Sequence, residues 1–552
     1  MRRHLRGLAV VLAACDPPKE APTETGAVPP LESAADSLPP ESAPPDSAPA
    51  CPEGQPCDDG DACTTGDACD AAGACLGEAV SCDDGDACTT DACVAETGAC
   101  EHQGWSGAPL DLYDLDAIRD PSTLDLELLD TDTTWEGLTP IEVTEIRYTS
   151  WASDGCALSP IRIEAYVARP TDTTADLPGL AVAHGLGGFA EAGSAATPAG
   201  QLGVVAIAWS GPGQGSSEGT GSTPDHLFDV LDSPRDSWFW EHAVAGMRAL
   251  TVLESWDGVD PTRMGVTGYS AGALASLTIN GVDDRVDSAF PVSGTGHLDL
   301  AIQATPNPGW ELDLLEAMTP PRDAARAEWS TFEAALDPKN YLASATGDVL
   351  LVTGAQDQFF PINSAVATYN DLVASGVDAR ILTIQDWDHG WFTLFDSGAA
   401  QALAEEDLAF WFDHSFGADP GLSELPPQPD TPVISPWTCF DEDTWLVWSC
   451  ALVAATLPAP TGYDVSDVSF HFSADGALTW ASWNLGWDED LGLWWAEVGT
   501  LDGSVYSASN LAFYSQFTFQ DGALGQRVTL TSAASLPPGF SPTIIPITGP
   551  LP

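Results

Sequence analysis

The stretch "RMGVTGYSAGALASL" (263–277) places Ser270 between two glycines, after a short apolar run and before a helix-like run. A serine at a sharp strand–turn–helix point needs small neighbours, because its own backbone is strained and the helix passes close to the strand. In such a context the hydroxyl is exposed at the edge of a sheet and can act as a nucleophile. The alternative is that Ser270 is only a small residue at a tight turn.

Three further elements could complete such a site. "AHGLGGF" (183–189) follows an earlier apolar run, and a backbone N–H of Leu186 could join that of Ala271 in binding a developing oxyanion. Asp357 follows "VLLVTGAQ", and His389 lies in "DWDHGW" after the next apolar run. The order Ser, Asp, His is one of the orders in which catalytic triads occur, with the histidine as general base and the aspartate orienting its ring.

Alternatives to these roles exist close by in the chain. Asp386 and Asp388 flank His389, and either could replace Asp357. His184 could be a structural residue of a glycine-rich turn, and the remaining histidines, His471 among them, lack the strand-end context and are interpreted as structural. The chemistry predicted is acyl transfer to water through an acyl-serine, and it requires no metal or cofactor.

The segments around these residues alternate in character from about residue 141 onwards. Short apolar runs rich in β-branched residues end in Gly, Ser or Asp, and helix-like runs lie between them, such as 238–255 and 362–375. The predicted strands cover 141–150, 161–170, 179–185, 203–211, 263–268, 286–294, 348–357 and 379–390. Alternating strands and helices predict a mostly parallel sheet covered on both faces, with its site at the carboxyl ends of the strands.

On these motifs, residues of about 140–415 resemble the α/β-hydrolase superfamily. "HGLGG", "WSGPGQGSSEG", "GYSAG", "GAQDQFFP" and "DHGW" are similar to its acetylxylan-esterase, dienelactone-hydrolase and prolyl-oligopeptidase branches. The resemblance implies Ser270 as nucleophile, His389 as base, Asp357 as its partner, and Leu186 and Ala271 as oxyanion donors. The loop at 209–219 departs from many relatives, which carry Asp or Arg where this chain has Trp-Ser.

Nine of the 13 cysteines lie between Cys51 and Cys100, in two copies of one pattern, "CDDGDACTTGDACDAAGAC" and "CDDGDACTTDACVAETGAC". We call residues 51–103 the Cys-rich module. So short a segment has almost no apolar core, so we expect a disulfide framework. Two bridges in each copy would use eight cysteines and leave Cys51, for which Cys156 is one candidate partner.

Each copy also carries Asp-Asp-Gly-Asp, which supplies two sets of carboxylates: Asp58, Asp59 and Asp61, and Asp83, Asp84 and Asp86. Clustered carboxylates beside a turn glycine suit a structural calcium ion. The full twelve-residue calcium-loop pattern is absent, however, and Asp-Gly turns between disulfides explain the same residues.

The N-terminal residues and the net charge of the chain indicate where the protein is located and what it can bind. Residues 1–15 have a basic region, a short apolar run and the ending Leu-Ala-Ala-Cys, which resembles a bacterial lipobox with lipidation at Cys15. The stretch 16–50 is rich in Pro, Ser, Glu and Ala and predicts a disordered tether. A formal charge of −65 over 552 residues excludes nucleic acid as a partner and leaves the lipid anchor as the only membrane contact. We expect a lipid-anchored protein of the cell envelope, or a secreted one.

The C-terminal part carries short alternating or aromatic-rich runs that predict an antiparallel β-sandwich. Cys439 and Cys450 are expected to form a disulfide. Trp487, Trp494 and Trp495 are candidates for a carbohydrate-binding face, although the aromatic residues are chiefly expected in the core. A hydrolase-type domain joined to a β-rich tail also resembles, more weakly, the bacterial PhoPQ-activated pathogenicity-related proteins.

The expected organisation is a signal peptide (1–15), a tether (16–50), the Cys-rich module (51–103), a catalytic domain (104–421), a linker (422–432) and a β-rich domain (433–552). The predicted function is a serine hydrolase, in first place a carboxylesterase for small acyl esters. A peptidase of the prolyl-oligopeptidase type is the alternative within enzymes. A non-catalytic surface adhesion or binding protein is the alternative of a different class.

Overall fold

The computed structural model describes residues 52–82, 89–94, 97–104, 107–155, 157–230, 233–303, 327–389, 397–416, 425–440, 444–458, 463–499, 501, 510–521 and 527–543. The chain divides into two compact units. One holds most of the Cys-rich module, and the other holds 103–488 and 493–552. Among the described residues, no helix has both the length and the apolar character needed to cross a membrane.

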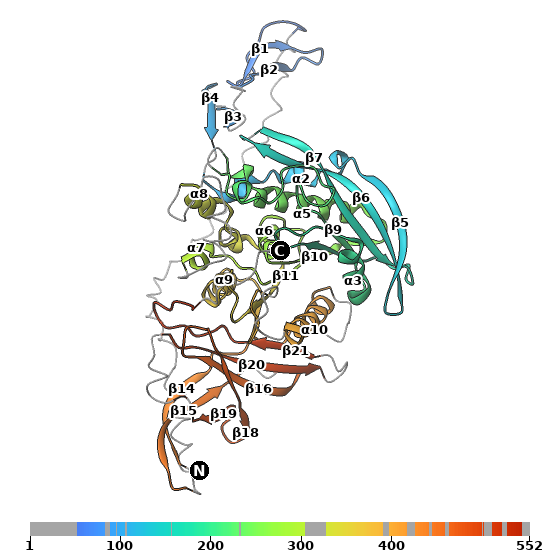
Figure 1. Ribbon diagram of the computed structural model, residues 1–552. Coiled ribbons are helices and arrows are strands. Elements are labelled where there is room, and N and C mark those ends of the chain that lie inside the picture. Colours follow the sequence, from blue (N-terminus) through green and yellow to red (C-terminus); the bar gives the residue numbers. More distant parts are fainter. Residues whose placement is uncertain are drawn as a thin grey trace, which may run out of the picture. The chain divides into compact units, whose positions relative to one another are not determined.

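A nine-stranded sheet forms the centre of the larger unit, in the order β13-β12-β11-β10-β8-β9-β7-β6-β5 (Figure 1). The six strands from β13 to β9 pair in parallel, as predicted. They are β8 (Leu177–Ala183), β9 (Val205–Trp209), β10 (Val259–Tyr269), β11 (Ser288–Val292), β12 (Asp348–Gly354) and β13 (Ala379–Ile384).

The other edge of this sheet is antiparallel and consists of β5 (Glu127–Glu136), β6 (Thr139–Asp154) and β7 (Ala157–Pro170). The long hairpin β6–β7 contains the two strands predicted at 141–150 and 161–170. Strand β5 was not predicted, because its sequence "ELLDTDTTWE" is largely polar and nine of its ten residues are exposed. An exposed edge strand lacks the apolar alternation by which a half-buried strand is recognised.

Helices cover both faces of the sheet, which confirms the predicted α/β architecture. On one face lie α5 (Trp238–Ser255), α6 (Ala271–Val282) and α9 (Ile362–Ala374), and on the other lie α3 (Ala192–Leu202) and α10 (Ser397–Ser415). Ser237 caps the N-terminus of α5, since its hydroxyl accepts the N–H of Phe239, and the helix is buried along almost its whole length. The shorter helices are α2 (Leu115–Arg119), α4 (Pro224–Leu227), α7 (Leu298–Gln303) and α8 (Ala327–Leu336), with 3₁₀ turns at Pro109–Leu112, Pro121–Thr123, Pro234–Asp236, Pro338–Asn340 and Leu342–Ser344.

The C-terminal part forms two four-stranded antiparallel sheets, which we call the sandwich. Their orders are β14-β15-β19-β18 and β17-β16-β20-β21 (Figure 1). The strands are β14 (Val433–Phe440), β15 (Val447–Ala455), β16 (Tyr463–Ser473), β17 (Ala481–Asn484), β18 (Gly486–Asp488), β19 (Leu493–Val498), β20 (Ala512–Asp521) and β21 (Arg527–Thr531). The predicted Cys439–Cys450 disulfide joins β14 and β15.

The sandwich shares one hydrophobic core with the part of the chain predicted to be catalytic (104–421), which we call the catalytic part. A single cluster of buried residues includes Trp387 and Phe410 of that part together with Phe470, Phe517 and Leu530 of the sandwich. The stretch expected to be a linker is also packed where the structure describes it (425–432). There the Gln428 side chain accepts the N–H of Ile381 on β13 and donates to the carbonyl of Thr531 on β21.

The Cys-rich module contains two small antiparallel pairs, β1 (Thr64–Cys69) with β2 (Cys75–Ala79), and β3 (Thr89–Cys93) with β4 (Cys100–Gly104). Its predicted disulfide framework is confirmed by Cys57–Cys75, Cys63–Cys93 and Cys82–Cys100, and Cys69 is disulfide-bonded as well. The expectation of two bridges inside each copy is wrong, because Cys63–Cys93 joins the two copies. Equal spacing within a repeat cannot distinguish pairing inside a copy from pairing between copies. Cys51 and Cys156 lie outside the described residues, as do Cys15 and the tether.

Candidate active site

Ser270 lies at the turn between the end of β10 and the start of α6. Its backbone has φ 58° and ψ −118°, a region that costs a serine of order 1–3 kcal/mol. Positions 268 and 272 must be glycines because neighbouring backbone passes too close to leave room for a side chain. A Cβ on Gly268 would lie 2.5 Å from the backbone of Gly272, and a Cβ on Gly272 would lie 2.4 Å from the carbonyl oxygen of Ala183. This is the geometry of a nucleophile elbow, which holds the hydroxyl out from the sheet.

His389 connects Ser270 to Asp357. The Nε2 atom of His389 lies 2.8 Å from the Ser270 hydroxyl, and its Nδ1 atom lies 2.9 and 3.0 Å from the two carboxylate oxygens of Asp357. A carboxylate can only accept, so Nδ1 carries the proton and Nε2 is free to accept from the serine. The structure therefore brings together the three side chains that the sequence singled out, from the ends of three different strands.

Asp357 is held in place by its own loop. It is 1% exposed, and its Oδ1 accepts the backbone N–H groups of Phe359 and Phe360, each at 2.8 Å. The ring centroids of Phe359 and Phe360 also lie 4.7 and 5.6 Å from that of His389, so two aromatic side chains pack against the imidazole. These two hydrogen bonds from backbone N–H groups fix the orientation of the buried carboxylate.

The two alternative aspartates are placed differently. The Asp386 carboxylate accepts the side-chain amide N–H groups of Gln356 and Gln385. Asp388 is buried near Tyr269, and burial together with the charges of Asp357 and Asp388 raises the pKa of that phenol. Asp357 is thus the aspartate that contacts the His389 ring.

The expected oxyanion loop lies beside Ser270. A Cβ on Gly185 would lie 3.5 Å from the Ser270 Cβ, and the loop turns back through a bond from the Gly188 N–H to the Gly185 carbonyl, with Leu186 inside this turn. Ala271 is the first residue of α6, so its N–H belongs to those that have no partner within the helix. Both candidate donors therefore come from segments that border the serine.

His184 fixes this loop rather than acting as a base. Its Nδ1 lies 2.7 Å from the Gly185 carbonyl oxygen, and its Nε2 accepts the N–H of Gly211 at 2.8 Å. Burial lowers the pKa of His184 to about 4, so the ring is neutral at neutral pH. The loop after β9, which begins at Ser210, is thereby connected to the loop after β8.

Comparison with known families agrees with this geometry. The model of the prolyl oligopeptidase family matches residues 242–419, which contain Ser270, Asp357 and His389. The protein is a serine hydrolase with an α/β-hydrolase fold. A second model, the Dictyostelium (slime mould) repeat, matches residues 81–103 of the Cys-rich module. No curated protein matches the chain significantly.

Solved structures similar to the hydrolase include esterases and peptidases. Acetyl xylan esterase 1 from Thermoanaerobacterium sp. is 19% identical, with 55% of this chain and 94% of that chain covered and a TM-score of 0.41. An acetyl xylan esterase from Paenibacillus sp. R4 is 20% identical (51% and 89% covered, TM-score 0.42). A puromycin-hydrolyzing peptidase from Mycobacterium tuberculosis is 16% identical (53% and 48% covered, TM-score 0.36).

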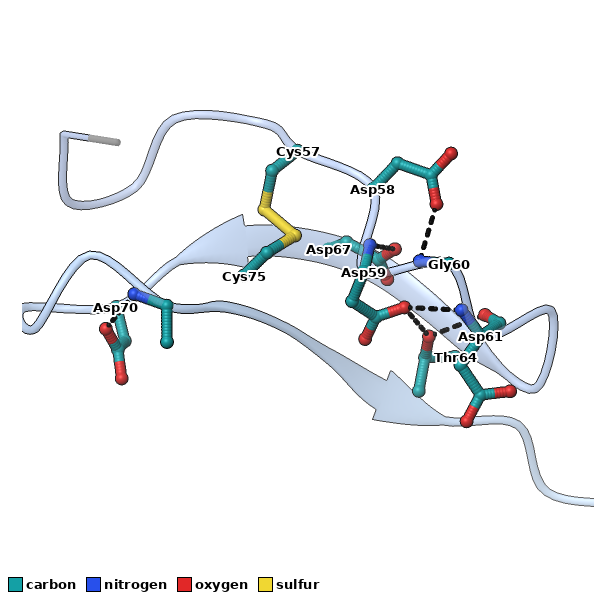
Figure 2. The surroundings of a disulfide bond; sticks show 10 residues. Cys57, Asp58, Asp59, Gly60, Asp61, Thr64, Asp67, Asp70 and Cys75 are labelled. Atoms are coloured by element: carbon teal, nitrogen blue, oxygen red, sulfur yellow. Dashed lines mark hydrogen bonds between the residues drawn. A yellow bond between two sulfur atoms is a disulfide. The ribbon is translucent and has the colours of Figure 1, made fainter. Parts of the chain in front are cut away.

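The aspartates of the Cys-rich module form mainly local turns (Figure 2). Asp58 accepts the N–H of Gly60, Asp59 accepts the N–H of Asp61 and the Thr64 hydroxyl, and Asp61 accepts the N–H of Cys63. Carboxylate oxygens of Asp58, Asp59 and Asp67 lie within 4.8 Å of one another, so the group that gathers includes Asp67 in place of Asp61. Sequence reasoning missed Asp67 because β1 carries it back to the turn. Asp83, Asp84 and Asp86 lie outside the described residues.

The tryptophans singled out in the sandwich differ in exposure. Trp487 is 52% exposed, while Trp494 packs against Phe517 and Trp495 donates its ring N–H to Asp488. Both of the latter are partly buried. The most exposed large aromatic residue of the described sandwich is Trp445, at 79%, which the sequence did not single out.

Proposed function

We propose that the hydrolase is a carboxylesterase that cleaves small acyl esters with Ser270 as nucleophile, His389 as general base and Asp357 as the group that orients it. The observation that carries the proposal is the 2.8 Å contact between the Ser270 hydroxyl and His389 Nε2, on a ring whose other nitrogen faces a buried carboxylate. An unassisted serine hydroxyl is a poor nucleophile at neutral pH, and this contact supplies the base that it needs.

The proposed steps follow from the two nitrogen atoms of His389. As the Ser270 oxygen attacks the ester carbonyl carbon, its proton passes to Nε2, and the imidazolium is stabilised by Asp357, which stays ionised. The oxyanion that forms is bound by the N–H groups of Leu186 and Ala271. When the C–O bond of the ester breaks, the proton passes from Nε2 to the leaving alcohol. Water then repeats the sequence on the acyl-serine and releases the acid.

We place an ester substrate ahead of a peptide because peptidases of the prolyl-oligopeptidase type filter peptides through a propeller domain. The described residues of the chain form no propeller that would filter peptides. The prolyl-oligopeptidase-type peptidase remains the second candidate, because the match to that family covers all three triad residues.

We also propose that the enzyme works outside the cytoplasm, anchored through a lipid on Cys15. Four disulfides join described cysteines, and disulfides persist in oxidising compartments. The basic, apolar and small residues of 1–15 lead to Cys15 in the order of a lipoprotein signal. Mass spectrometry of the mature protein tests this, and an unmodified N-terminus at another residue would contradict it.

The catalytic proposal is tested with a fluorophosphonate probe on the purified full chain. We expect labelling of Ser270, and loss of both labelling and p-nitrophenyl acetate hydrolysis in Ser270→Ala. Thermal unfolding of the variant serves as the control for folding. A folded Ser270→Ala variant that hydrolyses the ester at the wild-type rate would overturn the proposal. Parallel assays with p-nitrophenyl acetate, longer acyl esters and a proline peptide anilide decide between esterase and peptidase.

A further inference from the structure

The two loops that carry Asp357 and His389 are joined by direct hydrogen bonds. The N–H of Ala355 donates to the carbonyl of Ile384 at 2.8 Å, and the N–H of Gln356 donates to the carbonyl of Trp387 at 3.2 Å. The N–H of His389 donates to the side chain of Gln358 at 3.0 Å. The position of the His389 ring is therefore set by the course of the loop at 384–389, which approaches the loop of Asp357 closely.

One residue of the His389 loop has a strained backbone. Asp386 has φ 57°, although it is not a glycine and its side chain is exposed. Each of its two carboxylate oxygens accepts one side-chain amide N–H group, from Gln356 at 3.3 Å and from Gln385 at 3.1 Å. A strained residue persists only where its surroundings fix it. Here those surroundings are the two glutamine side chains.

Gln385 is in turn held by the sandwich. His471 of β16 lies with its Nδ1 at 2.7 Å from the Gln385 side-chain oxygen, and its Nε2 lies 2.9 Å from the Ser469 hydroxyl. Because Gln385 uses its amide nitrogen on Asp386, its oxygen faces His471, so Nδ1 donates and Nε2 accepts from Ser469. The His471 ring is 6% exposed and stacks on Tyr514 with 4.8 Å between ring centroids and an interplanar angle of 6°.

Two other contacts fix the sandwich against the same edge of the catalytic sheet. The Thr531 hydroxyl of β21 accepts the N–H of Thr383 and donates to the carbonyl of Ile381, both on the edge strand β13. Ile362, which follows the Asp357 loop, packs in a small buried cluster with Tyr514. The sandwich thus contacts the strand that leads into the His389 loop and the helix that follows the Asp357 loop.

We propose that His471 is a positioning residue for catalysis: through Gln385 and Asp386 it holds the loop that aims His389 at Ser270, so that the sandwich is a working part of the esterase site. The proposal rests on the proposed function, since it concerns the orientation of the general base. Neutral His471 is the donor that this chain of contacts requires, and burial lowers its pKa to about 4, which keeps the ring neutral at neutral pH.

The test compares two substitutions of His471 in the full chain. His471→Phe keeps a planar ring for Tyr514 but removes the donor to Gln385, whereas His471→Asn places an amide N–H near the position of Nδ1. We expect kcat of His471→Phe on p-nitrophenyl acetate to fall about 10- to 100-fold with KM within about two-fold, since displacing a catalytic group by 1 Å can cost about 10²-fold. His471→Asn should recover most of this loss, and the fluorophosphonate labelling rate should follow kcat.

A second pair of variants keeps the test decisive if His471→Phe does not fold. Gln385→Leu, at a partly exposed loop position, should reproduce the loss of kcat and should add little in combination with His471→Phe. Thr518→Val removes a buried hydroxyl that contacts Thr529 inside the sandwich, and it should lower stability while leaving kcat unchanged. Wild-type kcat in folded Gln385→Leu or His471→Phe, or equal losses in His471→Phe and His471→Asn, would overturn the proposal. Absence of Ser270 labelling in the wild type would instead overturn the proposed function.

Discussion

Two regions of this chain hold their folds by different means. In the Cys-rich module most side chains are exposed or only partly buried, and bridges such as Cys63–Cys93 connect short strand pairs. In the larger unit, helix α5 is buried along nearly its whole length, and one apolar cluster continues from the catalytic sheet into the sandwich. Cross-links stabilise mainly by restricting the unfolded chain, whereas a core stabilises by removing apolar surface from water. The proposed catalytic residues all lie in the second region, where a packed core can fix side chains to within the fraction of an ångström that catalysis requires.

The largest expected difference between the regions is in activity. His389→Ala removes the proposed base from Ser270, so turnover of p-nitrophenyl acetate should fall by roughly 10⁴- to 10⁶-fold, as in a well-studied serine protease triad. The variant should unfold at nearly the wild-type temperature. The matched control is Asp58→Asn in the Cys-rich module, which should leave turnover unchanged. A His389→Ala enzyme within ten-fold of the wild type would show that another group is the base.

The shared core predicts that damage to the sandwich reaches the catalytic part. Phe517 is fully buried and contacts the rings of Trp494 and Phe519, so Phe517→Ala should cost about 3–5 kcal/mol of unfolding free energy. Because the cluster is continuous with Trp387, two residues before His389, ester hydrolysis and the strand signal in circular dichroism should be lost in one thermal transition. Two separate transitions, with activity surviving the first, would mean that the sandwich folds independently.

Replacing an aspartate by asparagine should change the free energy of unfolding differently in the two regions. Asp407 of α10 is fully buried, and both of its carboxylate oxygens accept the Thr529 N–H of β21. Burial raises its pKa well above the usual range, so the native state favours the protonated form, and the stability it contributes is lost as the pH rises. Asp407→Asn should therefore stabilise the enzyme more at pH 8 than at pH 4 in chemical denaturation.

Asp59 of the Cys-rich module is the control for that measurement. It is fully exposed, and the N–H of Asp61 and the Thr64 hydroxyl lower the pKa of its carboxyl. Asp59→Asn should give no gain in stability at high pH. An equal gain in both variants would indicate relief of the overall negative charge rather than of one buried carboxylate.

The sequence predicted the catalytic part of this molecule better than the parts around it. Ser270, Asp357 and His389 could be singled out because each follows an apolar strand, and they lie together because the carboxyl ends of parallel strands meet at one edge of a sheet. Strand β5 was missed because it is exposed and polar, and the Cys63–Cys93 pairing because identical repeats offer no preference between copies. His471 was assigned a structural role, since its contact with Gln385 joins residues 86 positions apart and leaves no local signal.

The smallest expected effect completes the comparison. Cys63→Ser with Cys93→Ser removes the bridge between the two copies of the module, and loss of such a cross-link costs about 2–5 kcal/mol of local stability. No residue of the proposed triad is a cysteine, and the catalytic part has its own core. Turnover should therefore stay within about two-fold of the wild type, and chelators should leave it unchanged because the proposed steps use no metal. Limited proteolysis should meanwhile cleave the variant faster between residues 51 and 103. A large fall in kcat, with the unfolding temperature of the hydrolase unchanged, would show that the module takes part in catalysis and that the two regions are not separable in function.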